Sequence, residues 1–136
     1  MSGGSDLLAV AAGGALGSLG RWALTLAAGG AVWATALVNL TGAFALGLVV
    51  ARMAAGDHHP IWRPFVTVGV LGGWTTYSTF ALDGHALAGH GLAGLLGYVL
   101  ATLVLGVGAA LAGMVWGDRR WSGVPLETQR VSREEL

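Results

Sequence analysis

The sequence predicts an all-α integral membrane protein with four transmembrane helices. Of its 136 residues, 54% are hydrophobic and only 10% are charged, whereas soluble domains have about 25% charged residues. Four apolar segments reach or approach the roughly 20 residues that a helix needs to cross a hydrocarbon core of about 30 Å. Short connections separate these segments, which indicates that neighbouring helices run antiparallel.

The expected spans leave short turns between them and one polar tail. We expect a membrane domain over residues 1–117 and a C-terminal tail over 118–136. The spans are expected at about 7–28, 31–51, 61–82 and 91–116. Asp83 to His90 is expected to be the loop before the last span. The N-terminus has neither the basic start nor the cleavage site of a signal peptide, so the first span is expected to be retained.

Composition argues against several classes of protein. Seven arginines balance seven acidic residues, so net charge favours neither nucleic acid nor an anionic surface. Cysteine is absent, which excludes disulfides and thiolate chemistry. No nucleophile and base lie at a convincing spacing, so the protein is not expected to be an enzyme.

Glycine and tryptophan follow membrane patterns. Gly13 and Gly17 are four residues apart, as are Gly69 and Gly73. Small residues at this spacing let helix backbones approach closely in lipid, so we interpret both pairs as packing positions. Five of the six tryptophans fall near span ends, as in an aromatic belt. Trp74 is the exception, because it falls near the middle of its span.

The third span has an unusual centre. Residues 72–80 read Gly-Gly-Trp-Thr-Thr-Tyr-Ser-Thr-Phe, and this composition forms helix poorly. Non-helical backbone is tolerated at membrane depth only where protein or water covers it. The segment therefore either remains helical with its hydroxyls bonded to the preceding turn, or unwinds and directs carbonyls at a partner.

Three further features place polar groups within the spans. Asn39 lies near the middle of the second span, where it either has a functional role or forms an interhelical hydrogen bond. Arg21 lies near the end of the first span, where it snorkels to the interface or lines a water-filled vestibule. Tyr98 and Thr102 are four residues apart and share one helix face, where they form either a packing contact or part of a polar track.

These stretches together resemble the Fluc (CrcB) family of fluoride ion channels. Residues 13–22 are similar to its glycine-rich first helix, which ends in arginine and an aromatic residue. Residues 37–44 resemble its Val-Asn-x-x-Gly-x-Phe stretch, and 72–80 its Gly-Gly-x-Thr-Thr-Phe-Ser-Thr-Phe signature. Tyr98 and Thr102 are a weaker match to a polar track. The resemblance covers about residues 7–117.

The resemblance implies a fluoride channel in the cell inner or plasma membrane that exports fluoride passively. It implies a dual-topology dimer, with two four-helix subunits packed antiparallel and the third helix broken near mid-membrane. The implied fluoride pathway contains Asn39, Tyr77, Ser78, Thr79, Phe80, Tyr98 and Thr102. Backbone carbonyls of Gly72 and Thr75 from both subunits are implied to hold one structural Na⁺ at the dimer centre. Arg21 matches the arginine of the family, and the resemblance implies that it is a vestibule or structural residue.

The chemistry of the resembling residues fits fluoride, with two departures. Amide and hydroxyl groups donate hydrogen bonds that replace water, and the edge of the Phe80 ring carries partial positive charge. Weak, repeated sites suit conduction. Tyr77 stands where the family has phenylalanine, and Gly106 stands where the polar track often has serine.

Orientation bears on the dimer partner. Four arginines near the span ends fall on the side of the termini: Arg52, Arg63, Arg119 and Arg120. Only Arg21 falls toward the other side, so the positive-inside rule predicts cytoplasmic termini. The partner in the antiparallel dimer is a second copy of the chain or a paralogue of opposite orientation. A chain of fixed orientation does not pair antiparallel with itself easily, which gives the hypothesis of an oppositely oriented paralogue.

Two other functions compete with a channel. A small four-helix multidrug exporter would need a membrane-embedded carboxylate, and the expected span cores contain none. A non-transporting membrane subunit would explain the glycines, but not Asn39 together with residues 72–80.

Overall fold

The computed structural model describes residues 3–56 and 61–121, and these ranges fold into helices joined by short turns. The helical elements are α1 (Gly3–Ala27), α2 (Val32–Ala54), the π-helix η1 (Pro64–Leu71), α3 (Gly72–Trp74), α4 (Tyr77–Ala88) and α5 (Leu92–Trp121). Three of them, α1, α2 and α5, are long and apolar enough to cross a membrane. The fold is therefore that expected of an integral membrane protein.

The first turn reverses the chain through glycine. Gly29 and Gly30 have φ angles of 63° and 71°, a left-handed conformation that residues with a Cβ rarely adopt. Ala31 then caps α2 in an extended conformation. The expected spans 7–28 and 31–51 thus correspond closely to α1 and α2.

The expected loop from Asp83 to His90 is wrong. Helix α4 continues through Asp83 to Ala88, and only the turn at residues 89–91 connects it to α5. Gly91 allows that turn through a φ of 115°. A polar residue after an apolar segment suggests a loop, but Asp83 lies within α4, and its carboxylate has a hydrogen-bond partner on α5. Helix α5 also extends to Trp121, so the first residues of the expected tail are helical; residues 122–136 lie outside the described part.

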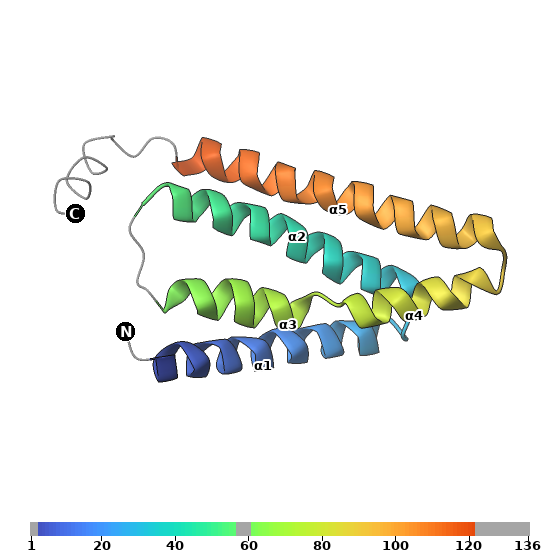
Figure 1. The fold of residues 1–136 in the computed structure, drawn as a ribbon, viewed down its shortest axis with the longest axis horizontal. Helices are drawn as coiled ribbons and strands as arrows, with labels where there is room; N and C mark the ends of the chain where they lie inside the picture. Colours follow the sequence, from blue (N-terminus) through green and yellow to red (C-terminus); the bar gives the residue numbers. More distant parts are fainter. Residues whose placement is uncertain (1–2, 57–60, 122–136) are drawn as a thin grey trace.

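Both glycine pairs that the sequence singled out are confirmed as packing positions. A Cβ added to Gly13 would lie 2.9 Å from the Val70 nitrogen, and one added to Gly17 would lie 2.8 Å from the Trp74 nitrogen. Gly69 and Gly73 meet the backbone of α1 in the same way. Helices α1 and η1–α3 therefore touch through their backbones along this seam (Figure 1).

Helices α2 and α5 form the second close pair. A Cβ on Gly47 would lie 2.8 Å from the Met114 nitrogen, and one on Gly113 would lie 3.1 Å from the Leu48 nitrogen. Phe44 and Trp116 add a ring contact with centroids 5.6 Å apart. In lipid, where apolar burial drives association weakly, such close backbone approach supplies the packing energy.

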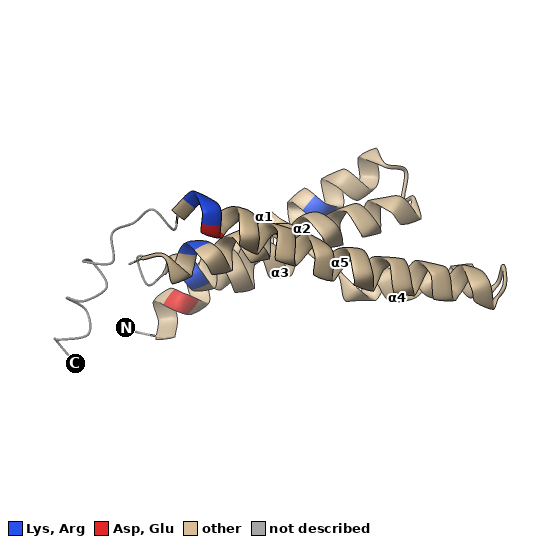
Figure 2. Cartoon of the chain, turned by 90° about the horizontal axis from the view of Figure 1, so that it is seen from above, with Lys and Arg blue, Asp and Glu red and all other residues tan. Residues whose placement is uncertain are grey.

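The chain changes packing partner between α3 and α4. Among the described elements, η1 and α3 pack against α1, whereas α4 packs against α5 and makes no contact with α1. Seen from above, the molecule forks at this point into an arm that contains the α1–α2 turn and an arm formed by α4 and α5 (Figure 2). The residues between α3 and α4 therefore lie at the fork.

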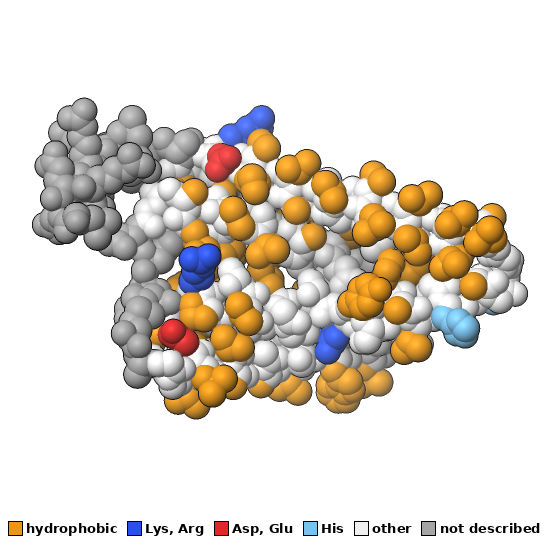
Figure 3. All heavy atoms as spheres, in the orientation of Figure 1, with side chains coloured by type: hydrophobic (Ala, Val, Ile, Leu, Met, Phe, Trp, Pro, Cys, Tyr) orange, Lys and Arg blue, Asp and Glu red, His pale blue; other side chains and the backbone are white. Residues whose placement is uncertain are grey.

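Charge is concentrated at one end of the molecule. Helix α1 begins, α2 ends and α5 ends at the same end, where most of the charged segments gather (Figures 1 and 2). On the face shown in Figure 3, apolar side chains are spread over the helices. Many leucines of the chain are largely exposed, among them Leu8 at 73% and Leu100 at 59%. Such a surface suits lipid rather than water.

Candidate functional site

The site is built around an extended turn at residues 75–76. Helix α3 ends at Trp74 and α4 begins at Tyr77; Thr75 has φ −76° and ψ 157°, and Thr76 has φ −146° and ψ 122°. Both residues are extended, which β-branched threonine adopts readily. The backbone groups of this turn need partners, because they lie where a continuous helix would have paired them.

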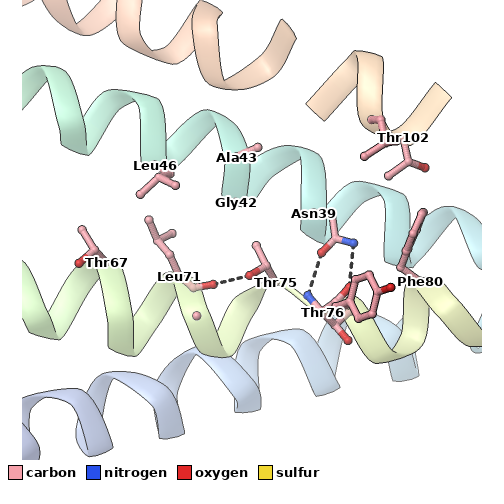
Figure 4. Close-up of a pocket in the computed structure, with 13 residues that line it drawn as sticks. Asn39, Gly42, Ala43, Leu46, Thr67, Leu71, Thr75, Thr76, Phe80 and Thr102 are labelled. Carbon is pink, nitrogen blue, oxygen red and sulfur yellow. Dashed lines mark hydrogen bonds between the residues drawn. The ribbon is translucent and has the colours of Figure 1, made fainter. Parts of the chain in front are cut away.

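Asn39 on α2 supplies partners for Thr76. The Thr76 N–H donates to Asn39 Oδ1 at 2.8 Å, and Asn39 Nδ2 donates to the Thr76 carbonyl at 3.0 Å (Figure 4). Thr76 is only 7% exposed, so an unpaired amide there would be costly. These two hydrogen bonds fix the orientation of the Asn39 amide and leave its second N–H for another acceptor.

The Thr76 side chain begins α4. Its hydroxyl oxygen accepts from the Thr79 N–H at 3.2 Å, as a helix N-cap does, and it donates to Thr79 Oγ1 at 3.1 Å. Ser78 Oγ lies 3.3 Å from the same hydroxyl. Ser78 and Thr79 are thus joined into one cluster of hydroxyls at the start of α4.

Two carbonyls lose their usual helical donors at this turn. In a continuous helix the Gly72 carbonyl would accept from the Thr76 N–H, and the Thr75 carbonyl from the Thr79 N–H. Here the Thr76 N–H donates to Asn39 Oδ1, and the Thr79 N–H donates to the Thr76 hydroxyl oxygen. Carbonyl oxygens released in this way are suitable ligands for a hard cation. They belong to Gly72 and Thr75, the two residues that the resemblance nominated.

A pocket of about 470 Å³ opens beside this turn. It brings together six residues nominated from the sequence: Asn39, Gly72, Thr75, Tyr77, Phe80 and Thr102. Apolar residues such as Leu46 and Leu71 complete its wall (Figure 4). A Cβ on Gly72 would meet nothing within 4 Å, so that residue faces open space. The pocket therefore combines an amide, hydroxyls, aromatic rings and an apolar wall.

Three aromatic rings extend from the pocket toward α5. The centroids of Tyr77 and Phe80 are 6.1 Å apart, and Phe80 stacks on Tyr98 at 5.2 Å. The Tyr98 hydroxyl donates to Asp83 Oδ2 at 3.4 Å. Tyr77 is 82% exposed, so its ring stands at the open side of the pocket. Tyr98 is not part of the pocket wall, but it touches that wall through Phe80.

Arg21 is placed apart from the pocket. It lies on α1, in the last two turns of that helix before the α1–α2 turn. It is partly exposed and is not among the pocket-lining residues.

Sequence reasoning overlooked two residues of the site. Thr76 carries the backbone groups that Asn39 binds, and the only sequence signal for it was its place after Thr75 in the motif. Asp83 was assigned to a loop, although a helical interpretation of residues 77–88 would have placed it three residues after Phe80.

Comparisons with known proteins identify the family of the chain. The family described as CrcB-like protein, Camphor Resistance (CrcB), matches residues 8–114. The chain belongs to the CrcB family. Proteins named fluoride-specific ion channel FluC are similar to it along most of their length. The one from Paracoccus denitrificans is 44% identical over 116 residues, covering 81% of this chain and 92% of the relative.

Two further relatives show similar coverage. The FluC protein of Agrobacterium fabrum is 40% identical over 119 residues, covering 82% of this chain and 95% of the relative. The protein named fluoride-specific ion channel FluC 2, from Nocardia farcinica, is 42% identical over 124 residues, covering 85% and 86%. The matched family region contains Asn39, the turn at residues 75–76 and Tyr98, so the whole site lies within it.

Proposed function

We propose that the chain is a subunit of a fluoride-specific ion channel, which exports fluoride passively across the cytoplasmic membrane and lowers cellular fluoride toxicity. The observation that carries this proposal is the Asn39–Thr76 pair beside an aromatic-walled pocket, in a CrcB-family chain. The names of its relatives support the choice of fluoride.

The pocket offers the chemistry that a small, strongly hydrated anion needs. One amide hydrogen of Asn39 is used by Thr76, so the other can donate to fluoride. Ring edges of Tyr77 and Phe80 present partial positive charge. The Thr102 hydroxyl lies in the same wall, and Ser78, Thr79 and Tyr98 continue the polar surface beyond it. Several weak donors in series favour passage over trapping.

In this proposal the chain crosses the membrane four times. The third span consists of η1, α3 and α4, and it is broken near mid-membrane at Thr75 and Thr76. Satisfaction of the Thr76 backbone by Asn39 supports this interpretation, because unpaired groups are not tolerated at membrane depth. The carbonyls of Gly72 and Thr75 would hold a structural Na⁺, which supplies a fixed positive charge near the anion pathway.

The functional unit is proposed to be an antiparallel dimer. Four helices are few to enclose a selective pore, and the pocket opens at a surface where Tyr77 is 82% exposed. Four arginines lie on the same side of the membrane as the termini and favour a cytoplasmic location for them: Arg52, Arg63, Arg119 and Arg120. The second subunit is then either a copy inserted in the opposite orientation or a paralogue of opposite orientation.

Fluoride efflux from liposomes tests both the activity and the partner. We expect fluoride, and not chloride, to leave vesicles that contain the channel, and a fluoride-sensitive host to be relieved when it expresses the chain. Vesicles that contain the single purified chain decide between the two partners. Robust efflux from them would remove the need for a paralogue.

Two variants connect the activity to the pocket. Asn39→Asp and Phe80→Ile are each expected to abolish fluoride efflux while expression is retained. Phe44→Ile is the control, because the Phe44 ring contacts Trp116 away from the pocket. Efflux that survives both pocket variants would show that these residues do not line the pathway.

The two alternative functions have less support. Relatives named as fluoride channels do not favour a multidrug exporter or a non-transporting subunit. The carboxylate of Asp83 lies in α4, but it accepts a hydrogen bond from Tyr98 rather than facing the pocket.

A further inference from the structure

Trp74 occupies the fork between three helices. The indole Nε1–H of Trp74 donates to Thr41 Oγ1 on α2 at 2.9 Å. A Cβ on Gly20 of α1 would lie 3.0 Å from the ring atom Cζ3, and one on Gly42 of α2 would lie 3.3 Å from Cδ1. Both neighbouring helices therefore have glycine where the indole sits, and the ring is inserted between them.

The hydrogen-bonding roles of this contact are settled by the chemistry of its groups. An indole N–H can only donate, so Thr41 Oγ1 must accept. The Thr41 hydroxyl hydrogen is used elsewhere, because Oγ1 donates to the Leu37 carbonyl at 2.7 Å. The oxygen thus has its lone pairs directed away from its own helix and toward Trp74. The indole is held by a fixed acceptor and not by a freely rotating hydroxyl.

The position of Trp74 in the chain gives this bond a consequence. Trp74 and Thr76 flank Thr75, and each is bonded to α2, at Thr41 and Asn39 respectively. Thr75 lies between these two attachments, and its own hydroxyl donates to the Leu71 carbonyl at 2.9 Å. The extended peptide is therefore held at both ends against the same helix.

We propose that Trp74 is a positioning residue, and that its bond to Thr41 forms a second clamp beside the Asn39–Thr76 pair. Together the two clamps fix the direction of the backbone at Gly72 and Thr75 and the start of α4. The pocket-lining rings of Tyr77 and Phe80 depend on that start. The effect on transport rests on the proposed channel function, whereas the clamp itself can be measured without it.

Four variants separate the hydrogen bond from the bulk of the ring. Trp74→Phe keeps an aromatic ring but removes the N–H, and Thr41→Val removes the acceptor with almost no change in shape. Thr41→Ser restores the hydroxyl and is the conservative rescue. Trp33→Phe is the matched control, since it also removes an indole N–H, from a residue that is 57% exposed on α2.

Fluoride efflux rates of these variants give a double-mutant cycle. Trp74→Phe and Thr41→Val are each expected to slow efflux about tenfold, and the double variant is expected to be no slower than either, because all three lose one and the same bond. Thr41→Ser and Trp33→Phe are expected to stay within about twofold of the parent chain. A double variant about a hundredfold slower would overturn the proposal, because the two residues would then act independently.

Nuclear magnetic resonance of the ¹⁵N-labelled chain measures the clamp directly. In Thr41→Val the Trp74 indole N–H resonance is expected to move, together with the backbone amide resonances of Thr75 and Thr76. Trp33→Phe is expected to leave those three unchanged. Unmoved Thr75 and Thr76 resonances would overturn the clamp even if transport fell. If the parent chain moved no fluoride, the proposed function would fail, but these resonances would still decide the clamp. Should Trp74→Phe not fold, Thr41→Val alone decides, because it leaves the ring in place.

Discussion

The two sides of the extended turn are held together by different interactions. Toward the termini, α1 meets η1 and α3, and α2 meets α5, mainly through glycine and backbone, with one ring contact between Phe44 and Trp116. At the turn and beyond it, Asn39 donates to the Thr76 carbonyl, Thr41 accepts from the Trp74 indole, and the rings of Phe80 and Tyr98 stack. One side is shaped by the absence of side chains, and the other by a few specific ones.

This difference indicates which part specifies function. Backbone contact through glycine depends on fit and tolerates no added atom, but it provides no donor for an anion. The turn needs polar side chains because its backbone has left the helix, and the second N–H of Asn39 remains for another acceptor. The scaffold and the site are therefore adjacent but chemically separate, and substitutions should distinguish them.

The largest effect is expected when the polar side loses Asn39. Asn39→Leu keeps a side chain of similar size but leaves both the Thr76 N–H and its carbonyl unpaired. Each unpaired group costs about 1–3 kcal/mol, so the free energy of unfolding should fall by about 2–6 kcal/mol. Reversible unfolding in mixed micelles measures this, and fluoride efflux should be lost as well.

A matched hydroxyl removal controls for that result. The Thr67 hydroxyl donates to the Arg63 carbonyl within its own helix, at 2.8 Å, so Thr67→Val leaves no group outside that turn unpaired. It should change the free energy of unfolding by less than about 1 kcal/mol. Equal losses for Asn39→Leu and Thr67→Val would mean that the turn does not depend on Asn39.

The glycine side should show a smaller effect that concerns stability alone. In Gly17→Ala the new Cβ would press on the backbone of Val70 and lie 2.8 Å from the Trp74 nitrogen. Such overpacking costs about 1–3 kcal/mol in the free energy of unfolding. Protein that remains folded should retain fluoride selectivity, because no pocket group is removed.

Gly14→Ala provides the control on the same helix. A Cβ at Gly14 would meet nothing within 4 Å, and alanine forms helix better than glycine by about 1 kcal/mol. This variant should be neutral or slightly stabilising. If Gly14→Ala destabilised the chain as much as Gly17→Ala, the close contact of Gly17 with η1 and α3 would not explain the loss, because helix propensity favours alanine at both positions.

The two sides also differed in how far the sequence predicted them. The spacing of Gly13 and Gly17 signals close packing within one helix, so both glycine pairs were predicted correctly. The partner of Asn39 was not predicted from spacing, because Thr76 is distant in sequence and bonds through its backbone, which every residue has. Motif resemblance found the neighbourhood of the site, and the fold supplied its bonds.

Asp83 shows a second limit of the sequence. A carboxylate after an apolar segment ordinarily marks a span end, so a loop was expected there. Its partner Tyr98 is fifteen residues away on α5, and only the three-residue turn at 89–91 brings the two helices together. The helix runs past Asp83 to Ala88, and the partner of the carboxylate lies on another helix, which local composition does not encode.

The smallest effect tests whether the arm formed by α4 and α5 depends on polar bonds as the turn does. Tyr98→Phe keeps the ring on Phe80 and removes only the hydroxyl, whose bond to Asp83 is long at 3.4 Å. A bond of that length contributes weakly, so the free energy of unfolding should fall by less than about 1 kcal/mol. Tyr77→Phe is the control, because the described residues give its 82% exposed side chain no hydrogen bond, and it should leave stability unchanged. If Tyr98→Phe lowered the free energy of unfolding as much as Asn39→Leu, ring stacking alone would not hold α4 against α5. The packing of this arm would then depend on a polar bond, as the turn does.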